Sequence, residues 1–292
     1  MRFWQFTGFM PTEQVLPLAQ ASERLGFEGL AIPDHLFYPQ EIVPAYPGTA
    51  DGVPFWRPDT HWPDPWALAS AVGAVTTTLR CMTAVYIAPA RDLFTVAKSI
   101  STAAVLTQGR VVAGLGAGWC REEFDQTGQA FSGRGRRMAE MIEVLRRLWA
   151  GGWVEHHGEW FDFDAVSMAP VPPAPIPITL GGRSEIALRR ATRIADGWVG
   201  GGSSATAVPE VIDRLHGYLE ENGRDPADFE ITIQPREWPT AEVLDELGRA
   251  GLDGIRIPAW EPAGEESPVE AKIEAIERFA EEVMRPLGVG GA

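Results

Sequence analysis

Four short stretches of the chain place glycine, arginine or histidine where an apolar segment ends. The run RVVAGLGAGW, from Arg110 to Trp119, passes from β-forming residues into alternating glycines that include Gly116 and Gly118. A buried strand that ends in glycine lets backbone amides approach a flat or phosphorylated ligand closely. Close packing between strands is the alternative explanation, but it would need fewer glycines than this run contains. The run therefore indicates that a ligand binds close to the end of this strand.

The sequence LGGRSE, which begins at Leu180, has the features of a small phosphate site. Gly181 and Gly182 free the backbone to turn its amides outward, and Arg183 can donate two hydrogen bonds to an anion. Ser184 opens the following helix, whose amino terminus carries partial positive charge. The alternative interpretation is an ordinary tight turn between strand and helix.

A second glycine-rich strand end, GWVGGGSS, brings Gly200 and Gly201 toward the same predicted phosphate site. A nicotinamide dinucleotide site is not favoured for the RVVAGLGAGW run, because Trp119 occupies the position of the required third glycine. Arg136 also stands near the position where such a site carries an acidic residue.

The tripeptide Pro33-Asp34-His35 ends another apolar segment and supplies the candidate catalytic residues. A histidine at the carboxyl end of a parallel strand can transfer a proton or hydrogen-bond a substrate oxygen. Asp34 could orient the imidazole ring or only cap a turn, and His35 could instead bind a loop carbonyl without chemistry. The chain has no HxH, HExxH or paired CxxC pattern, so we expect no metal site.

These stretches belong to a regular alternation of strands and helices. Eight short apolar segments bounded by glycine, proline or polar residues predict strands, and amphipathic helical patterns separate them. Eight parallel strands joined by helices close into a (β/α)8 barrel, an α/β fold of about this length. A doubly wound open sheet is the alternative, and the barrel is expected to form one domain over residues 1–292. The predicted strands are residues 3–8, 29–33, 80–88, 111–116, 176–180, 197–200, 229–234 and 254–258.

Three longer segments interrupt the alternation: residues 36–63 after the second strand, 120–132 after the fourth strand, and 153–175 after the fourth helix. The first two follow strands, so they should lie at the carboxyl end of the barrel, where sites form. The third precedes a strand and is expected to be a structural brace. Segment 36–63 is rich in aromatic residues and could be a plug, a lid or a substrate wall; its rings suggest an apolar or aromatic substrate.

The composition excludes some functions. With 25 basic and 40 acidic residues the net charge is −15, which disfavours binding to nucleic acid or to an anionic membrane surface. Only two cysteines occur, and the amino-terminal segment has the pattern of a strand rather than of a signal peptide. We therefore expect a cytoplasmic protein with no nucleic-acid or membrane partner.

Along nearly its whole length the sequence resembles the bacterial luciferase-like family of flavin and deazaflavin enzymes. The segments PDH, GAGW and RGRRMAEM are most similar to the oxidoreductases that use coenzyme F420, a deazaflavin. The resemblance is carried, in the family's order, by ERLGFEGLAIPDH, TAVYIAPARDLFTVAKSI, LTQGRVVAGLGAGWCREEF, RGRRMAEMIEVLRRLW, HGEWFDF, PVPPAPIPITLGGRSE and IADGWVGG.

The resemblance implies a luciferase-like barrel that holds a tricyclic ring at its carboxyl mouth. It also implies a bulge with a non-proline cis peptide bond in the third strand, which presses against the ring, and a homodimer formed through the second and third helices. The cofactor-binding residues implied in this way, together with those expected from the motifs, are His35, Ala84, Val85, Tyr86, Gly116, Gly118, Leu180, Gly181, Gly182, Arg183, Gly200 and Gly201.

By resemblance, the expected activity is hydride transfer between coenzyme F420 and a small apolar or aromatic organic substrate. Relatives that oxidise alcohols or sugars often carry a carboxylate where this chain has Ala117, which favours reduction of an activated double bond or carbonyl. The proton would come from His35, a tyrosine or water. One alternative is an FMNH2-dependent monooxygenase, with FMN as the cofactor, and another is a non-catalytic flavin-binding protein.

Overall fold

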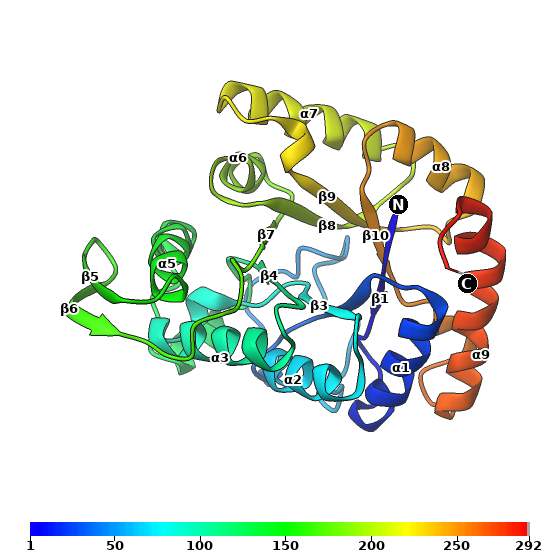
Figure 1. Ribbon diagram of the computed structural model, residues 1–292, viewed down its shortest axis with the longest axis horizontal. Helices are drawn as coiled ribbons and strands as arrows, with labels where there is room; N and C mark the ends of the chain where they lie inside the picture. The colour runs from blue at the N-terminus through cyan, green and yellow to red at the C-terminus, as the bar shows by residue number, and fades with distance from the viewer. Residues whose placement is uncertain (291–292) are drawn as a thin grey trace.

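The computed structural model describes residues 1–290, in which strands and helices alternate and close into a barrel (Figure 1). All neighbouring strands of the barrel pair in parallel, in the order β1-β10-β9-β8-β7-β4-β3-β2. The strands are β1 (Arg2–Phe6), β2 (Gly29–Ile32), β3 (Arg80–Thr83), β4 (Val111–Leu115), β7 (Ile178–Gly181), β8 (Gly197–Ser203), β9 (Glu230–Pro235) and β10 (Gly254–Ile257). The predicted (β/α)8 barrel is confirmed.

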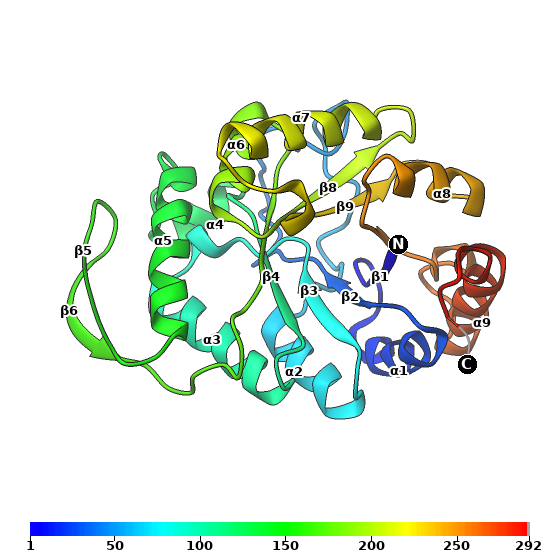
Figure 2. The ribbon, with the colours of Figure 1, turned by 45° about the horizontal axis from the view of Figure 1, so that its top comes forward.

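Helices surround the barrel (Figure 2), and local signals in the sequence fix their ends. Asp64 begins α2 by accepting hydrogen bonds from the amides of Trp66 (3.0 Å) and Ala67 (2.9 Å). Gly26 ends α1 in the left-handed region, with φ of 85°. The helices are α1 (Val15–Leu25), α2 (Pro65–Val75), α3 (Leu93–Leu106), α4 (Arg121–Gln126), α5 (Arg134–Trp149), α6 (Glu185–Ile194), α7 (Val208–Glu221), α8 (Ala241–Arg249) and α9 (Val269–Phe279). No helix in the described part of the chain is both long and apolar enough to cross a membrane.

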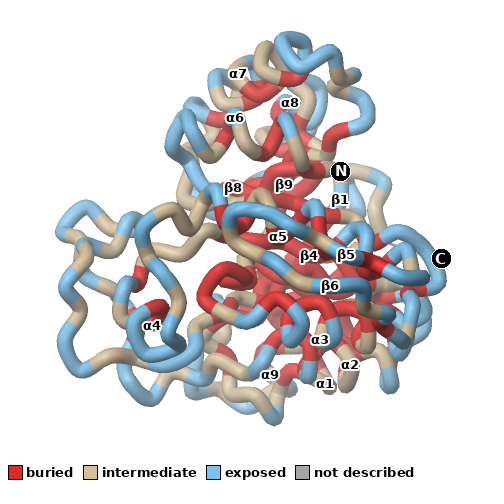
Figure 3. Tube along the Cα trace, turned by 90° about the vertical axis from the view of Figure 1, so that its left-hand side faces the viewer, coloured by how far each residue is buried: buried red, intermediate tan, exposed pale blue. Residues whose placement is uncertain are grey.

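The apolar residues form two layers because successive strand residues point to opposite faces. A small cluster that includes Trp4, Met82 and Val112 fills the inside of the barrel. A much larger cluster lies between the barrel and the helices and includes Leu30 and Ile178. Figure 3 shows buried chain concentrated along the strands. The strands therefore form a rigid base for the loops at their carboxyl ends.

All three expected insertions are present. Residues 36–63 follow β2, and residues 120–132, which contain α4, follow β4. Residues 153–175 contain an antiparallel hairpin, β5 (Trp153–His157) and β6 (Asp162–Ser167), that projects beyond α5 (Figure 1). Glu140 of α5 accepts hydrogen bonds from the amides of Trp160 and Phe161, at 3.0 and 2.9 Å. The hairpin is thus fastened to the outside of the barrel, as a brace would be.

The third strand is shorter than predicted. It ends at Thr83 instead of continuing to residue 88, and a cis peptide bond joins Ala84 to Val85. The chain then returns to the sheet at Tyr86, whose amide donates to the carbonyl of Gly114 at 2.8 Å. The bulge implied by the family resemblance is present at the expected residues.

Candidate functional site

A cavity of about 740 Å³ opens at the carboxyl ends of the barrel strands. This volume is within the range typical of ligand sites, roughly 300–1,000 Å³. Residues from β7, β8, β9 and β10 and from the segments after β3 and β4 form its walls, and residues 46–48 and Phe55 of segment 36–63 cover one side. We call segment 36–63 the aromatic loop.

Glycines allow the walls of this cavity to approach the bulge after β3. A β-carbon at Gly116 would lie 2.4 Å from Cγ2 of Val85, and one at Gly181 would lie 2.8 Å from Cγ1 of the same valine. Gly114, in the same run as Gly116, has a different function: a β-carbon there would collide with the carbonyl of Thr83 at 1.7 Å. The run therefore combines one glycine needed for strand packing with one that lines the cavity.

The segment after β7 has the features of an anion site. Ser184 caps α6 by accepting a hydrogen bond from the amide of Ala187 at 3.3 Å, and Gly182 has a φ of 121°. Arg183 donates to the carbonyl of Gly201 at 3.2 Å and to the carbonyl of Pro47, in the aromatic loop, at 2.7 Å. A guanidinium thus lies beside a helix amino terminus at the cavity rim, where an anionic group is favoured.

The charge of the cavity is opposite to that of the whole chain. Arg134, Arg183, Arg190 and Arg256 line it, whereas none of its lining residues in the described part of the chain is aspartate or glutamate. Burial, together with nearby positive charges, lowers the pKa values of Arg134 and Arg190. Cations held without acidic partners favour an anionic ligand.

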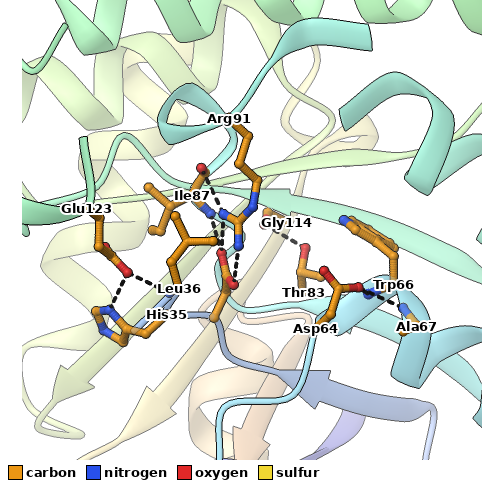
Figure 4. A network of polar contacts seen from close by, with 11 residues as sticks. His35, Leu36, Asp64, Trp66, Ala67, Thr83, Ile87, Arg91, Gly114 and Glu123 are labelled. Atoms are coloured by element: carbon orange, nitrogen blue, oxygen red, sulfur yellow. Dashed lines mark hydrogen bonds and ion pairs between the residues drawn. The ribbon is translucent and has the colours of Figure 1, made fainter. Parts of the chain in front are cut away.

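His35 forms a pair with a carboxylate that is distant in sequence. Its Nδ1 lies 3.2 Å from Oε1 of Glu123, which also accepts a hydrogen bond from the amide of Leu36 at 2.7 Å (Figure 4). The side chains are 12% and 1% exposed. Oε2 of Glu123 is enclosed and has no hydrogen-bond partner among the described residues. Glu123 therefore orients the imidazole from α4.

Aromatic rings cover this pair. The His35 ring lies 5.0 Å from Trp56, 5.2 Å from Trp62 and 5.9 Å from Trp119, measured between centroids. Trp119 also lines the cavity, and Tyr46 packs against it at 5.0 Å. In this arrangement His35 lies outside the cavity lining, so its access to a bound substrate requires movement of the aromatic loop.

Asp34 has a different position from the one expected. Its carboxylate accepts hydrogen bonds from both terminal nitrogens of Arg91, each at 2.8 Å, and from the amide of Ile87 at 2.9 Å. Burial raises the pKa of Asp34, and the Arg91 guanidinium opposes that shift. Of the two roles considered for Asp34, the structure does not show contact with the His35 ring, since Glu123 makes that contact. Asp34 instead fixes the segment that follows the bulge.

The structure brings most of the predicted cofactor-binding residues together. Tyr86 and Leu180 belong to the layer between barrel and helices, so their side chains point away from the cavity. Leu180 does so because strand residues alternate, and the Tyr86 ring packs on Trp66 of α2. His35 is the third predicted residue outside the lining. The predicted residues that line the cavity are Ala84, Val85, Gly116, Gly118, Gly181, Gly182, Arg183, Gly200 and Gly201.

Sequence reasoning missed several residues of the site. Glu123 follows the glycine run closely, and the acidic pair that it forms with Glu122 was the only available signal. Tyr46 lies in a loop without periodicity, and burial raises its pKa, so its hydroxyl stays protonated at neutral pH. Arg256 is near the end of the eighth barrel strand. The sequence does not indicate whether its side chain points into the barrel or toward the helices. No cluster of metal-binding side chains occurs among residues 1–290.

The fold and the site define a class of proteins: parallel barrels with a glycine-lined, cationic cavity at their carboxyl mouth. Residues 5–237 match the family described as luciferase-like monooxygenase, and the chain belongs to this family. An uncharacterised protein of Mycobacterium tuberculosis is 36% identical over 273 residues, which cover 92% of this chain and 94% of that protein.

Relatives with a described activity use two different cofactors. The F420-dependent hydroxymycolic acid dehydrogenase of Mycobacterium tuberculosis is 27% identical over 96% of this chain and 72% of its own length. The FMNH(2)-dependent dimethylsulfone monooxygenase of Pseudomonas fluorescens is 29% identical over 53% of this chain and 43% of its own length. Family members are thus flavin- or F420-dependent oxidoreductases.

Solved structures agree with the fold. An F420-dependent secondary alcohol dehydrogenase, in complex with an F420-acetone adduct, superposes with a TM-score of 0.76 at 16% identity, over 97% of this chain and 98% of that one. The monooxygenase RslO1 from Streptomyces bottropensis gives a TM-score of 0.77 at 17% identity, over 98% and 100% of the two chains.

Proposed function

We propose that the protein is an oxidoreductase that transfers a hydride between coenzyme F420 and a small apolar or aromatic substrate, in the direction of substrate reduction. The observation that carries this proposal is the cavity itself. Its glycines let the strand ends pack closely on Val85, which lines the cavity, and its arginines fit an anionic tail without any acidic lining residue. The relative that covers 96% of this chain is F420-dependent, whereas the FMNH2-dependent one covers 53%.

The lining residues would have different functions in coenzyme binding. Gly181, Gly182 and Arg183 would hold the phosphate at the amino terminus of α6. Val85, on the bulge after β3, would support one face of the ring. When bound, F420 supplies a hydride from its reduced ring.

A proton must reach the substrate together with the hydride. His35, oriented by Glu123, would donate it from Nε2 after the aromatic loop has moved. The hydroxyl of Tyr46 already lines the cavity and would hydrogen-bond a substrate oxygen. The indole rings of the aromatic loop would exclude water and contact an apolar substrate.

The decisive experiment is an anaerobic titration of the purified protein with F420 and with FMN, followed by fluorescence. We expect saturable binding of F420 that is tighter than that of FMN. Loss of the absorbance of oxidised F420 on reduction, and its return on addition of 2-cyclohexenone without oxygen, would then show hydride transfer to an activated double bond.

Two outcomes would contradict the proposal. Binding of FMN alone, with turnover that requires dioxygen, would identify a reduced-flavin monooxygenase. Tight coenzyme binding without turnover over a broad panel of enones, aldehydes and ketones would identify a non-catalytic flavin-binding protein.

A further inference from the structure

β10 directs the side chain of Arg256 across the inside of the barrel. Its Nη1 lies 3.4 Å from the carbonyl of Ala84, the first residue of the cis peptide bond, and its guanidinium lies 5.1 Å from the centre of the Phe6 ring. A β-carbon at Gly201 would lie 2.8 Å from Nη2. The guanidinium is therefore beside the bulge, on the floor of the cavity.

This arginine has no acidic partner. Its Nε is enclosed and makes no hydrogen bond to any described residue. No carboxylate in the described part of the chain is close enough to act on it, and Tyr46 is the one titratable group that does. Burial lowers the pKa of Arg256 to about 10, so it keeps its proton at neutral pH. An enclosed cation without a counter-charge is unfavourable unless a ligand supplies one.

Arg256 lines the first cavity, and a second cavity shares part of its wall with the first. The second cavity has a volume of about 450 Å³ and is walled by the aromatic rings of Phe6, Phe9, Trp56 and Trp260. Phe55 and Gln234 line both cavities, and Phe6 lies under the Arg256 guanidinium. Two carboxylates line the second cavity as well, but both belong to residues exposed at its outer rim, Glu261 and Glu265.

We infer that Arg256 binds a carboxylate of the substrate, whose apolar part occupies the second cavity. The inference rests on the proposed function, because it specifies the substrate class of that reaction. It places the substrate's anionic group on the guanidinium between β8 and β10, away from the phosphate site at α6. The expected substrates are therefore small aromatic or apolar carboxylates, rather than neutral molecules.

Benzoate and benzamide test this inference, since they share a shape and differ in charge. We expect benzoate to bind the wild-type protein at least about 10-fold more tightly than benzamide, measured by calorimetry or by saturation-transfer NMR. Arg256→Met should remove this difference, and Arg256→Lys should keep part of it. Arg249→Met is the control: Arg249 is exposed on α8 and lines neither cavity, so benzoate affinity should not change.

Three results would overturn the inference: equal affinity for the two probes, no benzoate binding at millimolar concentration, or unchanged benzoate affinity in Arg256→Met. If Arg256→Met weakens F420 binding instead, the anion that Arg256 recognises belongs to the coenzyme ring.

The titrations are made with and without coenzyme, and folding is checked by circular dichroism. A protein that binds neither F420 nor FMN but still prefers benzoate in an Arg256-dependent way would contradict the proposed function and not this inference.

Discussion

His35 and Glu123 are 88 positions apart in the sequence and meet at a distance of 3.2 Å. β2 delivers the histidine and the short helix after β4 delivers the glutamate, because parallel strands bring their carboxyl ends to one rim. A carboxylate on Nδ1 fixes the ring and leaves Nε2 for chemistry.

Replacement of His35 tests its function as the proton donor. We expect His35→Gln to lower kcat for enone reduction by about 10²–10⁴-fold, the usual contribution of general acid catalysis. Coenzyme affinity should change little, because His35 does not line the cavity. His61→Gln is the control, since that histidine of the aromatic loop contacts Thr12. Equal losses in the two variants would contradict this function.

Glu123 should act only through His35, as a positioning residue. We expect Glu123→Gln to lower kcat less than His35→Gln does, because the amide can still accept from Leu36. The double variant should be no slower than His35→Gln alone. Additive losses in single-turnover measurements would show that Glu123 has an independent function.

At the scale of elements, the strand order and the three insertions were predictable from the sequence because apolar periodicity is strong in this chain. The hairpin of β5 and β6 was not, since both strands are mostly exposed and show no clear alternation. The end of β3 was placed too late, because the apolar pattern continues through the bulge to Tyr86, which forms only an isolated bridge to Leu115. The placement of Arg256 and Glu123 in the site depends on the direction in which each side chain points. The spacing of residues in the sequence does not determine that direction.

The close approach of strand ends to the bulge can be tested at Gly116. Gly116→Ala would place a β-carbon against Val85, so we expect at least about a 10-fold loss of coenzyme affinity and about 1–3 kcal/mol of lost stability. Gly217→Ala in α7 is the matched control, because nothing lies within 4 Å of its added carbon. That substitution should leave binding unchanged and stabilise the helix. Normal binding by Gly116→Ala would contradict the assigned position of the ring.

A second element-scale test concerns the connection between α2 and β3. Burial opposes ionisation of Glu23, but hydrogen bonds from the amides of Thr78, Leu79 and Thr77 lower its pKa from 4.5 to about 2. A folded-state pKa below the unfolded one stabilises the protein above pH 4.5, and this stabilisation is lost as the pH falls toward 2.

We therefore expect Glu23→Gln to be less stable than wild type at pH 7 in urea unfolding, with a difference that shrinks between pH 4.5 and pH 2. Glu220→Gln, on the exposed surface of α7, serves as the control. A difference that does not vary with pH would contradict the assigned hydrogen bonds.

At the scale of the whole molecule, we propose a homodimer formed through α2 and α3, as the family resemblance implied. Val75, Val105 and Leu106 lie at the carboxyl ends of these helices and are exposed, Leu106 by 58%. Light scattering should give twice the chain mass of 31.9 kDa. Leu106→Glu should give the monomer mass, because an interface disfavours an unpaired buried charge. A monomeric wild-type protein would contradict the proposal.

The enclosure of His35 by three tryptophan rings has a consequence for the timing of each catalytic cycle. In the proposed reaction the imidazole gives up its proton only after the aromatic loop has moved, and bulk water is the source that restores it. The aromatic loop must therefore swing outward at least once per turnover, whatever the speed of the redox step. A more viscous solvent, such as concentrated sucrose, should therefore lower the turnover rate, while the barrier to hydride transfer stays the same.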